Sequence, residues 1–142
     1  MEQRISLITL GVRDMAAVAA FYDQLGWRRV ETQEGVIAFD LIGQTLGLYP
    51  LAELAKDIGV AEASLGHGAM TLGHNLADRA AVDALVQRAE AAGATILKAP
   101  QEVFWGGYHA YFSDPEGNIW EVAHNPFSPL AADGSFRWNG HG

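Results

Sequence analysis

The stretch ITLGV at residues 8–12 decides the fold, because a close copy of it, MTLGH, occurs at residues 70–74. Each copy is followed by an alanine-rich segment, AAVAAF at residues 16–21 and AAVDAL at residues 80–85. A third pair of similar segments follows later in each half, in the same order. Any one of these matches can arise by chance, but three in one order indicate a duplicated unit.

Each copy opens with the pattern of a strand followed by a helix. Residues 5–12 alternate between two faces, as a strand does. An apolar stripe with helical spacing follows, between Asp14, a typical N-cap, and Gly26, a typical terminating residue. The second half repeats this order with a strand at residues 68–74 and a helix closed by Gly93.

Short strands separated by turn residues complete each half. We expect them at residues 27–30, 36–41 and 45–49, and again at residues 95–98, 108–112 and 119–124. The predicted fold class is therefore α+β, a duplication of βαβββ modules within a single domain over residues 1–142. The modules are expected at residues 5–49 and 67–126, with a helical linker at residues 50–66 and a loosely docked or mobile tail at residues 127–142.

Composition narrows the classes of function. The chain has 142 residues, of which 49% are hydrophobic, enough for a folded core. The formal net charge of -8 disfavours binding to nucleic acid or to an anionic membrane surface. There are no cysteines, so any metal site would have to use histidine and carboxylate ligands. Without a recognisable export signal or membrane span, we expect a cytoplasmic protein.

Two groups of motifs carry a resemblance to a known family. The early group comprises TLGVRD at residues 9–14, AFY at residues 20–22 and LGW at residues 25–27. The late group comprises WGGY at residues 105–108 and YFSDPEGNIWEV at residues 111–122. The chain resembles the vicinal oxygen chelate (VOC) superfamily of glyoxalases, bleomycin-resistance proteins and extradiol dioxygenases. This resemblance implies a half-barrel cup built from the two modules.

The resemblance also implies where a metal would bind. Metal-dependent members place four ligands in the cup, one on the first and one on the last strand of each half. The corresponding positions here are Leu7, Gly47, Ala69 and Glu121, of which only Glu121 carries a side-chain lone pair. We therefore expect no tightly bound metal and no cofactor.

Strand alternation assigns candidate side chains to the cup. Ile8, Leu10, Met70 and Leu72 are expected to face the helices, with Phe112, Trp120 and Val122. The opposite face then carries Thr9, Thr45, Tyr49, Thr71, His109, Tyr111 and Glu121. If Phe112 pairs with Trp120 across the turn at residues 114–117, Tyr111 lies beside Glu121 and His109 lies opposite Ala123.

We predict that Glu121, Tyr111 and His109 are the catalytic candidates. The ligand-binding candidates are Thr9, Thr71, Tyr49, Trp105 and His67. Each has a second interpretation: Glu121 is either a proton-transfer group or a structural carboxylate held by Tyr111 and a threonine. Trp105, next to two glycines, is either a lid over an apolar ligand or packing over a strand end.

Three hypotheses for function follow. The first is a homodimer that encloses a small, apolar or aromatic molecule without a metal, with Phe127, Phe136 and Trp138 near its interface. The second is a glyoxalase-like lyase or isomerase, or a dioxygenase, with Glu121 as base and a non-standard metal site from His67, His109 and Glu121. The third is an interaction module whose cup is filled by its own side chains.

Overall fold

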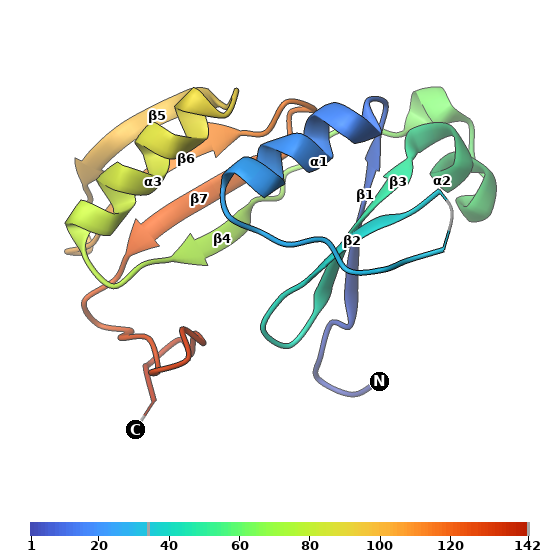
Figure 1. The fold of residues 1–142 in the computed structure, drawn as a ribbon. Helices are drawn as coiled ribbons and strands as arrows, with labels where there is room; N and C mark the ends of the chain where they lie inside the picture. Colours follow the sequence, from blue (N-terminus) through green and yellow to red (C-terminus); the bar gives the residue numbers. More distant parts are fainter. Residues whose placement is uncertain (34, 142) are drawn as a thin grey trace. The chain divides into compact units, whose positions relative to one another are not determined.

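The computed structural model describes residues 1–33 and 35–141. It divides into two compact units, Met1–Gly68 and Ala69–Gly142 (Figure 1). The first unit contains β1 (Leu7–Val12), α1 (Met15–Gln24), β2 (Ile37–Asp40), β3 (Thr45–Pro50), α2 (Leu51–Ile58) and a 3-10 turn, η1 (Glu62–Ser64). The second contains β4 (Leu72–Asn75), α3 (Arg79–Ala91), β5 (Thr95–Glu102), β6 (Tyr108–Ser113) and β7 (Ile119–His124). The fold is α+β, with two open sheets.

The first sheet has the order β1-β3-β2. Its central strand, β3, runs parallel to β1 and antiparallel to β2, with Leu7 opposite Thr45 and Val12 opposite Pro50. Apolar residues of β1 and β3 are buried, and α1 contributes a second set of buried residues. These residues are Leu10, Val12, Leu46 and Leu48 on the strands and Val18, Ala19, Phe21 and Tyr22 on the helix.

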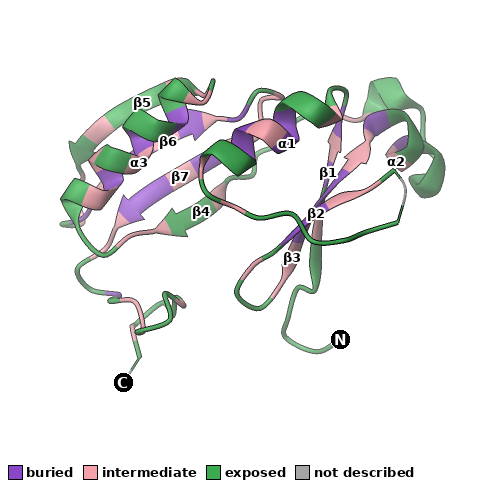
Figure 2. Cartoon of the chain, in the orientation of Figure 1, coloured by how far each residue is buried: buried purple, intermediate pink, exposed green. Residues whose placement is uncertain are grey.

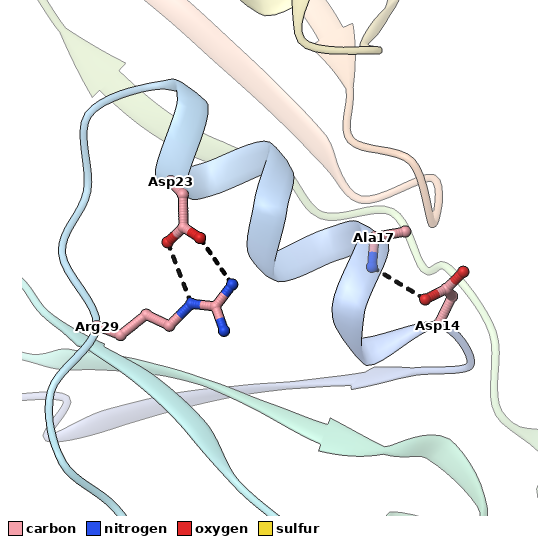
Figure 3. A network of polar contacts seen from close by, with 4 residues as sticks. All are labelled: Asp14, Ala17, Asp23 and Arg29. Carbon is pink, nitrogen blue, oxygen red and sulfur yellow. Dashed lines mark hydrogen bonds and ion pairs between the residues drawn. The ribbon is translucent and has the colours of Figure 1, made fainter.

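The ends of α1 form as the sequence predicts. Asp14 Oδ1 accepts a hydrogen bond from the backbone N–H of Ala17 at 2.9 Å (Figure 3). After the helix, Gly26 adopts a φ of 101°, the left-handed conformation that glycine permits. Asp23, near the helix end, pairs with Arg29 through two contacts of 2.7 and 3.2 Å (Figure 3).

The strand expected at residues 27–30 is wrong. The Trp27 N–H donates to the carbonyl of Tyr22 at 3.1 Å and is therefore used in closing the helix. The Trp27 ring stacks on Tyr22 with centroids 4.9 Å apart, and only Val30 forms an isolated bridge, to Ala38. The first unit is therefore βαββ, because side chains after Gly26 fold back onto the helix instead of extending along the sheet.

The predicted linker contains α2, which packs against β1. A Cβ atom on Gly11 would lie 2.8 Å from both Leu51 Cδ1 and Leu54 Cδ2. Gly11 therefore allows the closest approach of the helix to the strand. On the same face of the sheet, a Cβ atom on Gly47 would lie 3.5 Å from Leu7 Cδ1, an ordinary contact.

The second sheet has the order β4-β7-β6-β5, and α3 packs on one face of it (Figure 1). Only the second unit has the full βαβββ order. Its core is formed by buried residues of α3 and of the two central strands, β6 and β7 (Figure 2). The helix supplies Val82, Val86 and Ala89, and the strands supply Ala110, Phe112, Trp120 and Val122. This confirms the predicted alternation on β6 and β7.

The largest differences from the predicted strand boundaries in this unit are at β4 and β5. β4 begins at Leu72 instead of residue 68, and Met70 is 62% exposed instead of facing the helix. β5 continues to Glu102, with register shifts on both sides of Lys98. It is an edge strand, where Pro100 removes no hydrogen bond that the sheet needs.

The tail is hydrogen-bonded within itself. Ser128 is buried and donates its hydroxyl to the carbonyl of Trp138, and Nε2 of His141 lies 3.0 Å from the carbonyl of Ser135. The side chains of Phe127, Phe136 and Trp138 are exposed. Among the residues that the structure describes, no helix is long and apolar enough to cross a membrane.

Candidate functional site

The candidate site lies on the face of the second sheet opposite α3, which we call the Glu121 face. The register places Tyr111 beside Glu121 and His109 beside Ala123, as predicted. Gly73 of β4 lies beside Glu121 on the other side. From the edge strand, Lys98 lies opposite Tyr111, and Gln101 lies opposite His109.

A tight turn fixes this register. Asp114 Oδ1 accepts hydrogen bonds from the backbone N–H groups of Glu116 and Asn118, both at 2.9 Å. Its Oδ2 accepts a third from Asn118 Nδ2 at 2.8 Å. Gly117 completes the turn with a φ of 89°. The Asp-Pro-Glu-Gly sequence therefore acts as the sequence predicts, since it reverses the chain between two strands that face each other.

Glu121 connects the site's polar groups. The Tyr111 hydroxyl donates a hydrogen bond to Glu121 Oε2, and His109 Nδ1 lies 3.1 Å from the same oxygen. The hydrogen bond to Glu121 raises the pKa of Tyr111 to about 12, and burial contributes to this shift. The predicted contact between Tyr111 and Glu121 is confirmed, and the phenol stays protonated as a donor.

His109 is the most enclosed member of this group. Its side chain is 10% exposed. Its ring packs edge-on against the rings of Tyr111 and Trp105, with centroids 5.1 and 6.5 Å away. Among the described residues, Nε2 is buried and has no hydrogen-bond partner. Such an atom is unusual in a folded protein and often marks a functional position.

The Trp105 ring lies against the backbone of Gly107. A Cβ atom on Gly107 would come within 1.9 Å of the Trp105 ring, so any larger residue would displace the indole. The preceding Gly106 has a φ of 96°, and a Cβ atom there would lie 3.0 Å from the Phe127 ring of the tail. The two glycines thus let Trp105 and Phe127 approach the backbone closely.

Comparison with known proteins identifies the family to which the chain belongs. The sequence model described as Glyoxalase/Bleomycin resistance protein/Dioxygenase superfamily matches residues 4–122. The chain belongs to this family. The resemblance seen in the sequence is confirmed, and the matched region ends just beyond Glu121.

Several solved structures are similar to this member of the glyoxalase superfamily. One, a glyoxalase-related enzyme from Fulvimarina pelagi, is 35% identical with a TM-score of 0.90, and covers 98% of this chain and 100% of its own. A family enzyme from Burkholderia phytofirmans PsJN is 30% identical, with a TM-score of 0.77 and coverage of 85% and 98%. A lactoylglutathione lyase from Agrobacterium tumefaciens is 28% identical, with a TM-score of 0.66 and coverage of 88% and 96%. A comparison with curated protein sequences gives no match.

The family's metal positions do not fit a metal in this chain. Leu7 and Gly47 lie on one face of the first sheet, where the Leu7 methyl group stands next to the glycine. Ala69 precedes β4 and offers no ligand atom. Glu121 Oε2 already accepts two donors. Within residues 1–33 and 35–141, no three His, Asp or Glu side chains form a group suited to a metal ion.

The remaining predicted residues belong to different parts of the chain. Thr9 and Tyr49 share one face of the first sheet, as predicted, and Tyr49 is hydrogen-bonded to Asp57 of α2. Burial and this hydrogen bond raise the pKa of Tyr49. His67 lies in the first unit and Thr71 just before β4, both exposed. A shared site for these residues with Glu121 stays a prediction.

Sequence reasoning missed two features of the site. It placed His109 opposite Ala123 without foreseeing that the ring turns toward Glu121, which depends on side-chain rotation. It noted the paired glycines but not that Gly107 seats the Trp105 ring. An aromatic residue directly before two glycines is the signal that could have suggested this contact.

Proposed function

We propose that the Glu121 face binds a small apolar or aromatic molecule without a tightly bound metal. The observation that carries this proposal is the cluster of Tyr111, His109 and Glu121 beside the Trp105 ring. Aromatic walls with a few converging polar groups are the usual composition of a small-molecule site. The non-coordinating residues at Leu7, Gly47 and Ala69 support the absence of a metal from this function.

A second candidate function is catalysis by Glu121 as a base, in a glyoxalase-like lyase or isomerase or in a dioxygenase. The specific observation in its favour is that Glu121 contacts the ring of a histidine, an arrangement suited to proton transfer. The 35% identical Fulvimarina pelagi protein is described as a glyoxalase-related enzyme, which also supports this candidate. The metal site that the sequence suggested for this candidate, from His67, His109 and Glu121, lacks structural support, because no three His, Asp or Glu side chains among residues 1–33 and 35–141 form such a group.

Metal analysis and an activity assay separate the two candidates. Protein purified without chelator should contain no stoichiometric zinc, nickel, manganese or iron, and should not convert the glutathione hemithioacetal. A stoichiometric metal that is lost in Glu121→Gln would instead favour the second candidate. The Glu53→Gln variant, on the exposed surface of α2, controls for loss of charge alone.

Binding is tested directly by protein-observed NMR with a set of small neutral aromatic compounds. The proposal predicts that chemical-shift changes cluster at Trp105, His109, Tyr111 and Glu121, and that Glu121→Gln weakens them. Changes confined to other surfaces, or none across the set, would refute the proposed binding function.

A further inference from the structure

We propose that His109 Nε2 accepts a hydrogen bond from the bound molecule, so that the site selects neutral compounds carrying a hydroxyl or N–H group on a flat apolar body. This inference rests on the proposed binding function and specifies the chemistry of its ligand. The Nε2 atom is buried and has no hydrogen-bond partner among the described residues.

The partners of Glu121 fix which nitrogen of His109 carries the proton. Glu121 Oε2 already accepts the Tyr111 hydroxyl, so this oxygen acts as an acceptor. His109 Nδ1, 3.1 Å from the same oxygen, therefore carries a proton and donates it. In the neutral imidazole, the other nitrogen then has a lone pair and no proton. In that form Nε2 is an acceptor with no donor among the described residues.

The surroundings of Nε2 favour an apolar body on that donor. The Trp105 ring meets the His109 ring edge-on, and Gly107 holds the indole close to the backbone. Because Nε2 itself is buried, a ligand's donor can reach it only when a covering side chain moves aside, and an aromatic ligand could then pack on these rings. Leaving a buried acceptor without a donor costs free energy. A ligand that supplies a donor should therefore bind more tightly than a ligand of the same shape that lacks one.

Charge argues for a neutral ligand over an anionic one. Glu121 lies at the centre of the cluster, and the whole chain carries a formal charge of -8. An anion placed beside this carboxylate would be repelled. Lys98, opposite Tyr111 in the register, is a cation that could offset the repulsion, so an anionic probe belongs in the test.

The test compares three probes of one shape: 2-naphthol, 2-methoxynaphthalene and 2-naphthoate. Calorimetric titration should show that 2-naphthol binds about tenfold more tightly than 2-methoxynaphthalene, as expected for one added hydrogen bond. In His109→Phe, which keeps a ring but removes the acceptor, this ratio should fall to about one. Histidine-selective ¹⁵N NMR of the unaltered protein should show Nδ1 protonated and Nε2 unprotonated, with the Nε2 signal moved by 2-naphthol alone.

A matched pair of glycine variants tests the apolar contact. Gly107→Ala displaces Trp105 and should weaken all three probes while keeping their ratio. Gly66→Ala, in the segment between η1 and β4, adds a methyl group with nothing within 4 Å, so it should change little. Equal loss in both variants would refute the role of Trp105.

The outcomes distinguish this inference from the function on which it rests. Equal affinity for 2-naphthol and 2-methoxynaphthalene at the Glu121 face overturns the inference and leaves the binding function intact. A protonated Nε2, or tightest binding by 2-naphthoate, also overturns it, because the histidine would then act as a donor. If no probe binds and the NMR screen is also negative, the proposed binding function itself is refuted.

Discussion

At the residue scale, one carboxylate oxygen organises the Glu121 face. Glu121 Oε2 receives both the Tyr111 hydroxyl and the His109 Nδ1–H. Because both donors compete for one oxygen, a change in one should alter the other. The properties of Tyr111 and His109 are therefore best measured together with substitutions of Glu121.

The first prediction concerns the titration of Tyr111. Its pKa is raised from 10.0 to about 12, so the stabilising effect of its hydrogen bond is complete below pH 10.0 and is lost as the pH rises through about 12. The difference in tyrosinate absorbance between the unaltered protein and Tyr111→Phe should have its midpoint near 12. In a Glu121→Gln background this midpoint should fall toward 10.0, because the amide carries no charge.

Tyr108 is the internal control for this measurement. Its hydroxyl donates to Asp83 of α3 at 2.6 Å, and this hydrogen bond raises its pKa independently of Glu121. The titration of Tyr108 should therefore be the same in both backgrounds. If the titration midpoint of Tyr111 is the same with and without Glu121→Gln, the assigned hydrogen bond is contradicted.

At this scale, the sequence predicts those features of the site that follow from strand alternation. Parity and one turn suffice to place Tyr111 beside Glu121, because neighbours across antiparallel strands share a face. The rotation of His109 toward Glu121 and the unpaired Nε2 depend on side-chain torsions and on packing against Trp105. The pattern of residue types along the chain does not determine these torsions or this packing.

At the element scale, α1 and α3 begin in the same way. Asp14 accepts from the Ala17 N–H, and Asp78 accepts from the Ala81 N–H at 2.8 Å. The duplication thus preserves the N-cap as well as the apolar stripe. Each cap satisfies a backbone donor that the helix itself leaves unbonded.

The second prediction is that Asp14→Ala and Asp78→Ala each lower the free energy of unfolding by about 1 kcal/mol. Urea unfolding followed by circular dichroism measures this change. Glu90→Ala, in the last turn of α3, is the matched acidic control and should change stability little or raise it slightly, since an acidic residue there opposes the helix dipole. A loss in Glu90→Ala as large as in the two cap variants would contradict the capping role.

The third prediction concerns the packing of α2 on β1. Gly11→Ala would place a methyl group 2.8 Å from the ends of Leu51 and Leu54 and should destabilise the protein by about 1 to 3 kcal/mol. Gly47→Ala, on the neighbouring strand, meets Leu7 only at 3.5 Å and should be tolerated. Thermal unfolding of both variants tests this, and equal stability would show that α2 adjusts freely.

Helices were easier to predict than strands in this chain, for a physical reason. The helix ends carry strong local signals in Asp14, Gly26 and Gly93, and all three act as predicted. The strand expected at residues 27–30 fails because Trp27 packs on Tyr22, a contact that overrides strand propensity. The extension of β5 through Pro100 depends on its position at the sheet edge, which the local sequence does not reveal.

At the scale of the whole molecule, both sheets are open and each leaves edge strands. Exposed aromatic side chains accompany them in the tail, with Trp138 78% and Phe127 68% exposed. Edges and apolar surface of this kind are commonly covered in an assembly. The homodimer expected from the sequence is therefore retained as a proposal.

The fourth prediction is a homodimer at micromolar concentration, measured by light scattering coupled to size exclusion. Trp138→Ala should shift the equilibrium toward the monomer, because it removes exposed aromatic surface from the tail. His141→Ala, three residues further along the same tail, is the control and should leave the dimer unchanged. A monomer in the unaltered protein would count against the proposal.

The parallel pairing in each unit joins its first strand to its last: β1 pairs with β3, and β4 pairs with β7. A ribosome delivers the chain from its N-terminus, so each opening strand emerges well before its partner. The pair in the first unit is complete once Pro50 has emerged, whereas β4 waits until residues 119–124 have been translated. Closing such long loops is slow compared with forming α3. During this interval β4 is an unpaired strand, the kind of exposed edge through which unfinished chains associate.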